Sequence, residues 1–231
     1  MNKKWEVNKR EEEKIEQVAQ ENNISSLLAS ILVNRNIISK EKVQLFLNPT
    51  RNDFHDPFLM PDMKQAVDRI LKAIEAKEKV IIYGDYDVDG ITSITVLKKF
   101  LAERELEVGS YMPNRLEEGY GLNKKAIEQI AGQNYTLMIT VDCGISGNEE
   151  IDYAKELGID VIVTDHHEPG EQIPNCLAVV DAKRKDSEYP FNQLAGVGVV
   201  FKLIQAIKRV NKFRCKRIFK IFRYCLCGNY F

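Results

Sequence analysis

The sequence predicts an α/β fold with a mostly parallel sheet and crossover helices, preceded by a small helical amino-terminal region. From residue 80 onward, short apolar segments of strand length alternate with longer segments of helical apolar spacing. This alternation is typical of βαβ units, in which each crossover helix packs back onto the sheet. The first 60 residues show short helical patterns instead. With 231 residues, 44% of them hydrophobic, the chain can bury a sizeable core.

The amino-terminal region, residues 1–62, is expected to contain short helices and a connector. Residues 25–36 and 39–49 each combine helical apolar spacing with an initial serine, whose hydroxyl can cap a helix. Residues 53–63 are rich in proline and are expected to connect this region to the rest. The strongest helical pattern of the chain follows at residues 63–79.

The α/β domain is expected to span residues 63–210. Its predicted strands are residues 79–84, 107–113, 136–142, 159–165 and 176–181. Its predicted crossover helices are residues 90–105, 123–132 and 148–158, and a further helix begins near residue 196. Ligands of parallel sheets bind beyond the carboxyl ends of the strands. Polar residues that follow these strands are therefore the first place to look for a site.

Acidic and imidazole side chains follow three of the predicted strands. They are Asp85, Asp87 and Asp89 after the first, Asp142 after the third, and Asp165, His166 and His167 after the fourth. We expect them to converge on one edge of the sheet. Carboxylates with imidazole in an open site suit Mn²⁺ or Mg²⁺, and two such ions about 4 Å apart serve phosphoryl transfer.

The stretch YGDYDVDG at residues 83–90 has two other interpretations. It matches the opening of a calcium-binding EF-hand loop, but that loop requires a glutamate at its twelfth position, where Val96 stands, and a helix before it. An exposed acidic turn that caps a helix explains one carboxylate, such as Asp89, but not three. A metal site accounts for all three.

The motifs resemble those of the DHH phosphoesterase superfamily. YGDYDVDGITS, VDCGI and TDHH look like its first three motifs, and MPNRLEEGYGL (112–122) and LAGVGVVFKL (194–203) resemble segments of bacterial RecJ-type single-stranded-DNA exonucleases. The resemblance runs from Trp5 to about residue 210. It implies a two-metal, Mn²⁺- or Mg²⁺-dependent 5′→3′ exonuclease that releases mononucleotides from single-stranded DNA in DNA repair and recombination.

The resemblance also implies roles for the residues of these motifs. Asp87 and Asp89 would be metal ligands with Asp85 beside them, Asp142 would bridge two ions, and His166 would complete one coordination sphere.

Further roles concern the groups around the metals. His167 would face the scissile phosphate, and Asp165 would orient the histidine pair. Arg115 would contact a substrate phosphate; an exposed loop arginine is the alternative. Tyr83 stands where many small-molecule members have a histidine, so the resemblance implies that one ion is held more loosely.

Charge and cysteine content argue against several classes of function. Residues 1–210 hold 27 basic and 34 acidic residues, which argues against histone-like binding of nucleic acid but leaves room for a local basic groove. The five cysteines form no CxxC pair, so neither a zinc site nor a disulfide framework is indicated. No apolar stretch approaches membrane-spanning length, and residues 1–14 lack the apolar stretch of a secretory signal. We expect a cytoplasmic protein that does not bind membranes.

Residues 211–231 depart from the family pattern. They contain six basic residues, no acidic residue and three of the five cysteines. One interpretation is a basic amphipathic segment for membranes or nucleic acid. We prefer an aberrant, frameshifted tail, because a shifted reading of permitted codons resembles the family's approach to its fourth motif. Members of the family are expected to have an aspartate in that fourth motif and a carboxyl-terminal domain with a Gly-Gly-His motif. This sequence contains neither, so we expect the chain to be truncated and impaired.

Two further functional hypotheses stay open. One is a DHH phosphoesterase that acts on short oligonucleotides, cyclic dinucleotides or pyrophosphate. The other is a non-catalytic fragment that binds metal or nucleic acid. The first 60 residues and the NRLEEGYG segment favour the exonuclease.

Overall fold

A computed structural model describes residues 10–115 and 118–211 of the chain. The chain divides into two compact units, residues 1–54 and 55–231. The predicted boundary after residue 62 stays a prediction, as does the tail at residues 211–231, which lies outside the described residues except for Asn211.

The amino-terminal unit contains three short α-helices and a 3-10 turn. Their bounds are α1 Glu12–Asn22, α2 Ser26–Asn34, α3 Lys40–Leu47 and η1 Arg51–Asp53. The hydroxyl oxygens of Ser25 and Ser39 accept hydrogen bonds from backbone amides of α2 and α3, as their N-cap positions predict. A small core joins the helices, with Ile15, Leu32 and Val43 buried.

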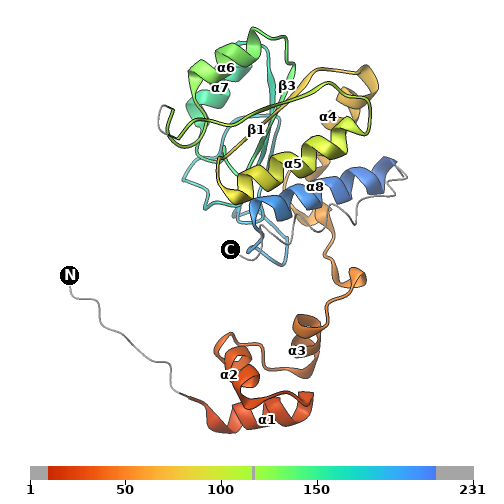
Figure 1. Ribbon diagram of the computed structural model, residues 1–231, viewed down its shortest axis with the longest axis vertical. Helices are drawn as coiled ribbons and strands as arrows, with labels where there is room; N and C mark the ends of the chain where they lie inside the picture. Colours follow the sequence, from red (N-terminus) through yellow and green to blue (C-terminus); the bar gives the residue numbers. More distant parts are fainter. Residues whose placement is uncertain (1–9, 116–117, 212–231) are drawn as a thin grey trace, which may run out of the picture. The chain divides into compact units, whose positions relative to one another are not determined.

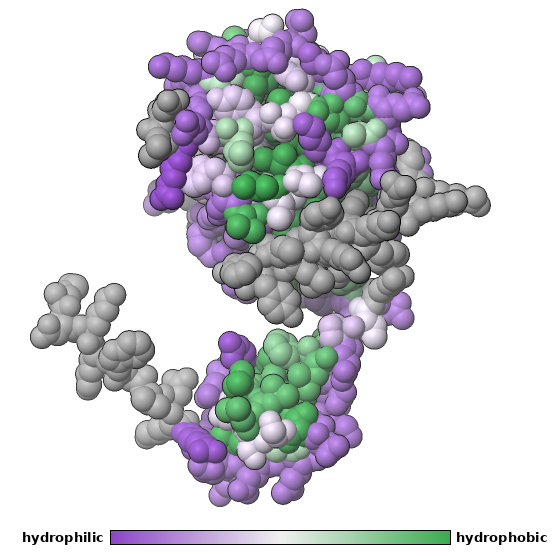
Figure 2. Space-filling model, in the orientation of Figure 1, coloured by the Kyte–Doolittle hydropathy of each residue, from purple (hydrophilic) through white to green (hydrophobic). Residues whose placement is uncertain are grey.

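One surface of this unit is apolar, as the lower body in Figure 2 shows. Exposed apolar side chains on α2 and α3 include Leu27, Ile31, Leu45 and Phe46.

The second unit contains a five-stranded, fully parallel sheet (Figure 1). The strands are β1 Val80–Gly84, β2 Val108–Tyr111, β3 Leu137–Val141, β4 Asp160–Thr164 and β5 Ala178–Val180. Their order in the sheet is β2-β1-β3-β4-β5. The chain runs outward from β1 to β2 and then returns to the other side of β1. The topological switch therefore lies between β1 and β3, where ligands of such sheets bind.

Helices cover both faces of the sheet (Figure 1). They are α4 Met63–Ala76, α5 Val88–Ala102, α6 Lys124–Ala131, α7 Asn148–Glu156 and α8 Gly196–Asn211, with a 3-10 turn η2 at Pro57–Leu59. Helices α4, α5 and α8 share one apolar core with the strands, and α6 and α7 share another on the opposite face. All five predicted strands and the predicted helices are present, which confirms the α/β fold class.

An ion-pair network joins α4 to the amino-terminal edge of the sheet. The guanidinium of Arg69 on α4 lies 2.6 Å from Asp160 at the start of β4 and 2.6 Å from Glu78, which precedes β1. Removing one partner would leave a largely buried charge unpaired, which is costly. The network thus fixes α4 on the sheet at the edge opposite the polar motifs.

Within residues 10–115 and 118–211, no helix has both the length and the apolar character required to cross a membrane.

Candidate active site

The carboxyl edge of the sheet brings the three polar motifs together. Asp85, Asp87 and Asp89 follow β1 or start α5, Asp142 follows β3, and the Asp-His-His sequence follows β4. Because β1 and β3 are neighbours and β3 pairs with β4, these loops meet at the switch point.

Carboxylates in the loop after β1 accept hydrogen bonds from backbone amides of the loop and of the start of α5. Asp85 is 4% exposed, and its Oδ1 accepts a hydrogen bond from the Tyr86 amide at 2.7 Å. Asp87 is exposed and caps α5, because its Oδ1 accepts from the Gly90 amide at 2.9 Å. Burial raises the pKa of Asp85, and the neighbouring Asp87 adds to the shift. A cation at this loop would relieve that cost.

Asp89 lies in the site, in the first turn of α5, and also caps another helix, α8. Its two carboxylate oxygens accept hydrogen bonds from the amides of Gly196 (2.6 Å) and Val197 (2.8 Å), at the start of α8. Its Oδ2 is 3.6 Å from Nε2 of His166. A carboxylate oxygen has more than one acceptor position, so these bonds leave capacity for an ion. The contact with α8 was not predicted from the sequence.

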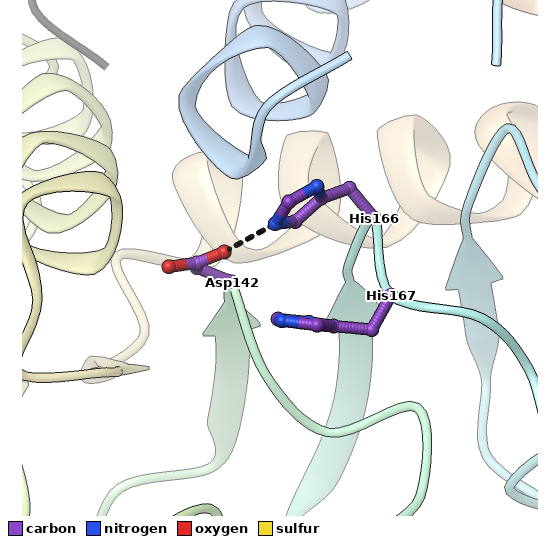
Figure 3. A group of neighbouring side chains, drawn as sticks. All are labelled: Asp142, His166 and His167. Carbon is purple, nitrogen blue, oxygen red and sulfur yellow. Dashed lines mark ion pairs between the residues drawn. The ribbon is translucent and has the colours of Figure 1, made fainter. Parts of the chain in front are cut away.

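Asp142 is a deeply buried carboxylate, and one of its oxygens accepts no hydrogen bond from the described residues. It is 1% exposed, and its Oδ1 lies 2.9 Å from Nε2 of His166 but accepts no hydrogen bond of good geometry from the described residues. Burial raises its pKa to about 7, against the opposing effect of His166, with Asp89 and Asp87 adding to the rise. Figure 3 shows Asp142 and His166 pointing toward one another, with His167 alongside.

Asp165 orients the histidine pair. Its Oδ1 lies 2.7 Å from Nδ1 of His167 and accepts from the amide of His166, while its Oδ2 accepts from the Ile145 amide. Burial alone would raise the pKa of Asp165, but the hydrogen bonds from His167 and Ile145 outweigh it and keep the pKa low. The carboxylate in turn raises the pKa of His167. On its other ring nitrogen, His167 faces the hydroxyl of Tyr120 at 3.3 Å.

Two sets of three side chains could each hold a metal ion, because within each set the potential ligand atoms all lie within 4.8 Å of one another. One consists of Asp142, His166 and His167, the other of Asp85, Asp87 and Asp142. Asp142 belongs to both sets.

The surroundings of Asp142 fit a cation. Its Oδ1 is buried and accepts no hydrogen bond from the described residues, and the carboxylate faces Gly196, where a Cβ atom would come within 2.6 Å of Oδ1. The donor set of carboxylate and imidazole is also one that Mn²⁺ and Mg²⁺ accept.

Arg115 and Tyr83 lie in different places relative to this site. Arg115 is exposed, 5.4 Å from the centre of the Tyr86 ring, and its charge opposes the rise in the pKa of Asp85 that burial causes. Tyr83 is fully buried, and its hydroxyl donates to the carbonyl oxygen of Gly121. Its hydroxyl is therefore bonded to the loop before α6.

Sequence reasoning missed two neighbours of the site. Asp181 directly follows β5, is fully buried, and has no hydrogen bond on Oδ2 from the described part of the chain. Burial raises its pKa to about 6, while the charge of His166 acts in the opposite direction. Tyr120 faces His167 and helps line a cavity of about 290 Å³ together with Leu122 and Ile145. An aspartate directly after an apolar strand was the available signal for Asp181.

The family model described as "DHH family, N-terminal domain" matches residues 79–228. The chain belongs to the DHH family. This is the family that the three motifs predicted, so the recognition is confirmed.

Curated relatives of this DHH chain are single-stranded-DNA-specific exonucleases named RecJ. The Bacillus subtilis protein is 46% identical over 204 residues, which are 88% of this chain and 26% of the relative. The Escherichia coli protein is 38% identical over 63% of this chain and 26% of the relative. The chain thus spans about a quarter of the length of these relatives.

Solved structures of RecJ share the fold. An exonuclease RecJ bound to manganese is 31% identical, with a TM-score of 0.66, over 73% of this chain and 42% of that one. RecJ from Thermus thermophilus in complex with Mn²⁺ is 24% identical, with a TM-score of 0.72, over 94% of this chain and 30% of that one. The second match concerns the fold alone.

Proposed function

We propose that this DHH chain carries the site of a metal-dependent phosphodiesterase that degrades single-stranded DNA from the 5′ end to mononucleotides. The single observation that carries the proposal is that two sets of ligand atoms share Asp142. Two adjacent sites with one common carboxylate suit a pair of divalent ions, the arrangement that serves displacement at phosphorus. The RecJ relatives act on single-stranded DNA, and a solved RecJ carries manganese.

In this proposal five side chains hold Mn²⁺ or Mg²⁺. Asp85, Asp87, Asp142 and His166 belong to the two sets, and Asp89 lies outside both, with its Oδ2 3.6 Å from Nε2 of His166. When bound, such ions neutralise charge on the phosphodiester and lower the pKa of water, which makes hydroxide available near neutral pH.

The remaining polar groups act on the substrate. His167 turns Nδ1 to Asp165, which leaves Nε2, 3.3 Å from the hydroxyl of Tyr120, as the ring nitrogen that can donate to a phosphate oxygen. Asp165 fixes the orientation of that ring through Nδ1. Arg115, exposed beside Tyr86, supplies a positive charge for a neighbouring phosphate.

The domain limits belong to the same proposal. Residues 1–62 form the helical amino-terminal region, residues 63–210 form an incomplete DHH domain, and residues 211–231 form an aberrant tail that results from a frameshift. Reading the coding DNA from codon 200 onward tests the last assignment; an unshifted frame with no continuation of the family pattern in the other frames would contradict it.

The activity test uses the purified 231-residue chain with Mn²⁺ and a 5′-phosphorylated single strand of about 30 nucleotides. Because the chain is expected to be impaired, we expect mononucleotides to be released slowly, and a further loss of at least about 100-fold in that rate for Asp142→Asn, because the shared carboxylate is removed. Asp68→Asn is the matched control, since Asp68 is exposed on α4 and pairs only with Lys64 among the described residues.

Two outcomes would contradict the proposal. Cleavage of a dinucleotide without cleavage of the long strand would indicate a small-molecule phosphodiesterase. Binding of the long strand without cleavage, unchanged in Asp142→Asn, would indicate a non-catalytic binding module.

A further inference from the structure

The chain between β2 and α6 is described at residues 112–115 and 118–123, which carry Arg115 beside Tyr86 and Tyr120 beside His167. It has no regular secondary structure where the structure describes it. Gly119 and Gly121 have φ angles of +80° and +87°, and among the described residues no atom outside their chain neighbours lies within 4 Å of where a Cβ would be. Glycine imposes little conformational preference, so side-chain contacts must fix the path of this segment.

One carboxylate joins the two ends of the segment. Oε1 of Glu118 accepts hydrogen bonds from the hydroxyl of Tyr111 (2.5 Å) and from Nδ2 of Asn123 (3.0 Å). Its Oε2 accepts from the backbone amide of Asn114 at 2.7 Å. Tyr111 ends β2 and Asn123 caps α6, so Glu118 connects two fixed elements across the loop. These hydrogen bonds lower the pKa of Glu118, which keeps it ionised as an acceptor.

A second contact fixes the segment to β1. The hydroxyl of Tyr83 donates to the carbonyl oxygen of Gly121 (3.0 Å) and accepts from Nδ2 of Asn123 (3.3 Å). Tyr83 is fully buried on β1 and stacks on Tyr111, with ring centroids 5.1 Å apart. The strand that precedes Asp85 therefore also holds this segment.

The residues that the network holds face the site. The hydroxyl of Tyr120 lies 3.3 Å from Nε2 of His167, and the two rings meet edge to face. Tyr120 is 58% exposed, so a substrate that reaches His167 also meets this ring.

We infer that Glu118, together with Tyr83, Tyr111 and Asn123, forms a positioning network that fixes Tyr120 and Arg115 for the substrate. The inference rests on the proposed function for the identity of that substrate, single-stranded DNA. None of the four residues needs to touch it. They act by reducing the conformations open to the segment before binding, which lowers the ordering cost of binding.

The test compares Glu118→Gln and Tyr111→Phe with Tyr153→Phe in the full chain. The glutamine keeps one acceptor oxygen, but its amide cannot accept from Asn114, and the phenylalanine removes one donor. Tyr153→Phe is the matched control, because its hydroxyl donates to Glu128 at 2.5 Å in the same kind of bond on the exposed surface of α6 and α7.

Two readouts do not depend on activity. Amide hydrogen exchange should become about tenfold faster in residues 114–123 of both test variants and stay unchanged in the control. Fluorescence anisotropy in EDTA with a 5′-phosphorylated oligothymidine should show binding about three- to tenfold weaker in the test variants only. In the nuclease assay, KM should rise by a similar factor while kcat stays within about twofold.

Exchange in residues 114–123 that matches wild type in both test variants would overturn the inference. So would faster exchange combined with unaltered DNA affinity, which would mean a purely structural network. If wild type binds no DNA at all, the proposed function fails and the substrate part of the inference fails with it, whereas the exchange experiment still decides whether the network orders the segment.

Discussion

At the scale of single residues, the site contains carboxylates whose burial lowers the stability of the folded protein. Asp142 and Asp181 are 1% and 0% exposed, and each has an oxygen without a hydrogen bond from the described residues. Burial raises the pKa of Asp142 to about 7 and that of Asp181 to about 6. Such groups lower the stability of the folded protein, and a protein retains them where function requires them. A cation that binds to them offsets this loss of stability.

Asp181→Asn is expected to stabilise the metal-free protein at pH 8. The carboxyl group titrates near pH 4 when unfolded and near pH 6 when folded, so the unfolded state loses its proton first and stability falls as pH rises through that window. Asparagine has no charge to bury, so the gain should be about 1–3 kcal/mol above pH 6 and should vanish toward pH 4. Urea unfolding in EDTA at pH 4 and pH 8 measures it. An equal gain at both values would assign the effect to packing instead of charge.

At the scale of elements, the first turn of α5 is the most constrained part of the site. Asp87 caps the helix, and Asp89 in its first turn accepts the first amides of α8, so two helices and two candidate ligands share one turn. The turn is also tightly packed, since a Cβ at Gly90 would lie 2.3 Å from the carbonyl oxygen of Asp85. Backbone atoms at that distance cannot move aside without displacing Asp85.

Gly90→Ala is therefore expected to destabilise the protein, although alanine is favoured over glycine in helices by about 1 kcal/mol. The overpacking should exceed this gain and leave a net loss of about 1–3 kcal/mol. Gly132→Ala is the matched control: Gly132 ends α6 with φ −62°, and its nearest atoms lie at 3.5 Å, so alanine should be neutral or stabilising. Denaturant unfolding of both variants checks the pair, and a stabilised Gly90→Ala would show that the turn is looser than these contacts indicate.

At the scale of the whole molecule, every candidate ligand belongs to the unit at residues 55–231. The amino-terminal unit has its own small core, which contains none of them. The two units are thus expected to differ in their response to metal.

Mn²⁺ should slow amide exchange in the second unit and leave the first unit unchanged. A ligand that binds only the folded state stabilises it by about 2.7 kcal/mol at a concentration 100 times its dissociation constant. Exchange measured by mass spectrometry should show increased protection around β1, β3 and β4 and unaltered rates across α1–α3. Asp142→Asn should abolish the increase. Added protection in both units would mean that metal binding is coupled to the whole chain.

The sequence by itself determined the order and type of the elements and the motifs at the strand ends. Apolar periodicity is a local signal, so strands such as residues 159–165 and the serine-capped helices were predictable from their own residues. The rule that parallel strands place their ligands at the carboxyl edge also predicted that Asp142 and His166 would meet.

Only the tertiary structure decided contacts between residues far apart in the chain. The two oxygens of Asp89 meet amides more than 100 residues away, the hydroxyl of Tyr120 reaches His167, and Tyr83 turns its hydroxyl to the loop before α6. Such contacts depend on the strand order β2-β1-β3-β4-β5 and on the path of the connecting loops, which no local pattern encodes. Asp181 shows the same limit, because an aspartate after a strand becomes a buried, partly unsatisfied carboxylate only once β5 pairs with β4.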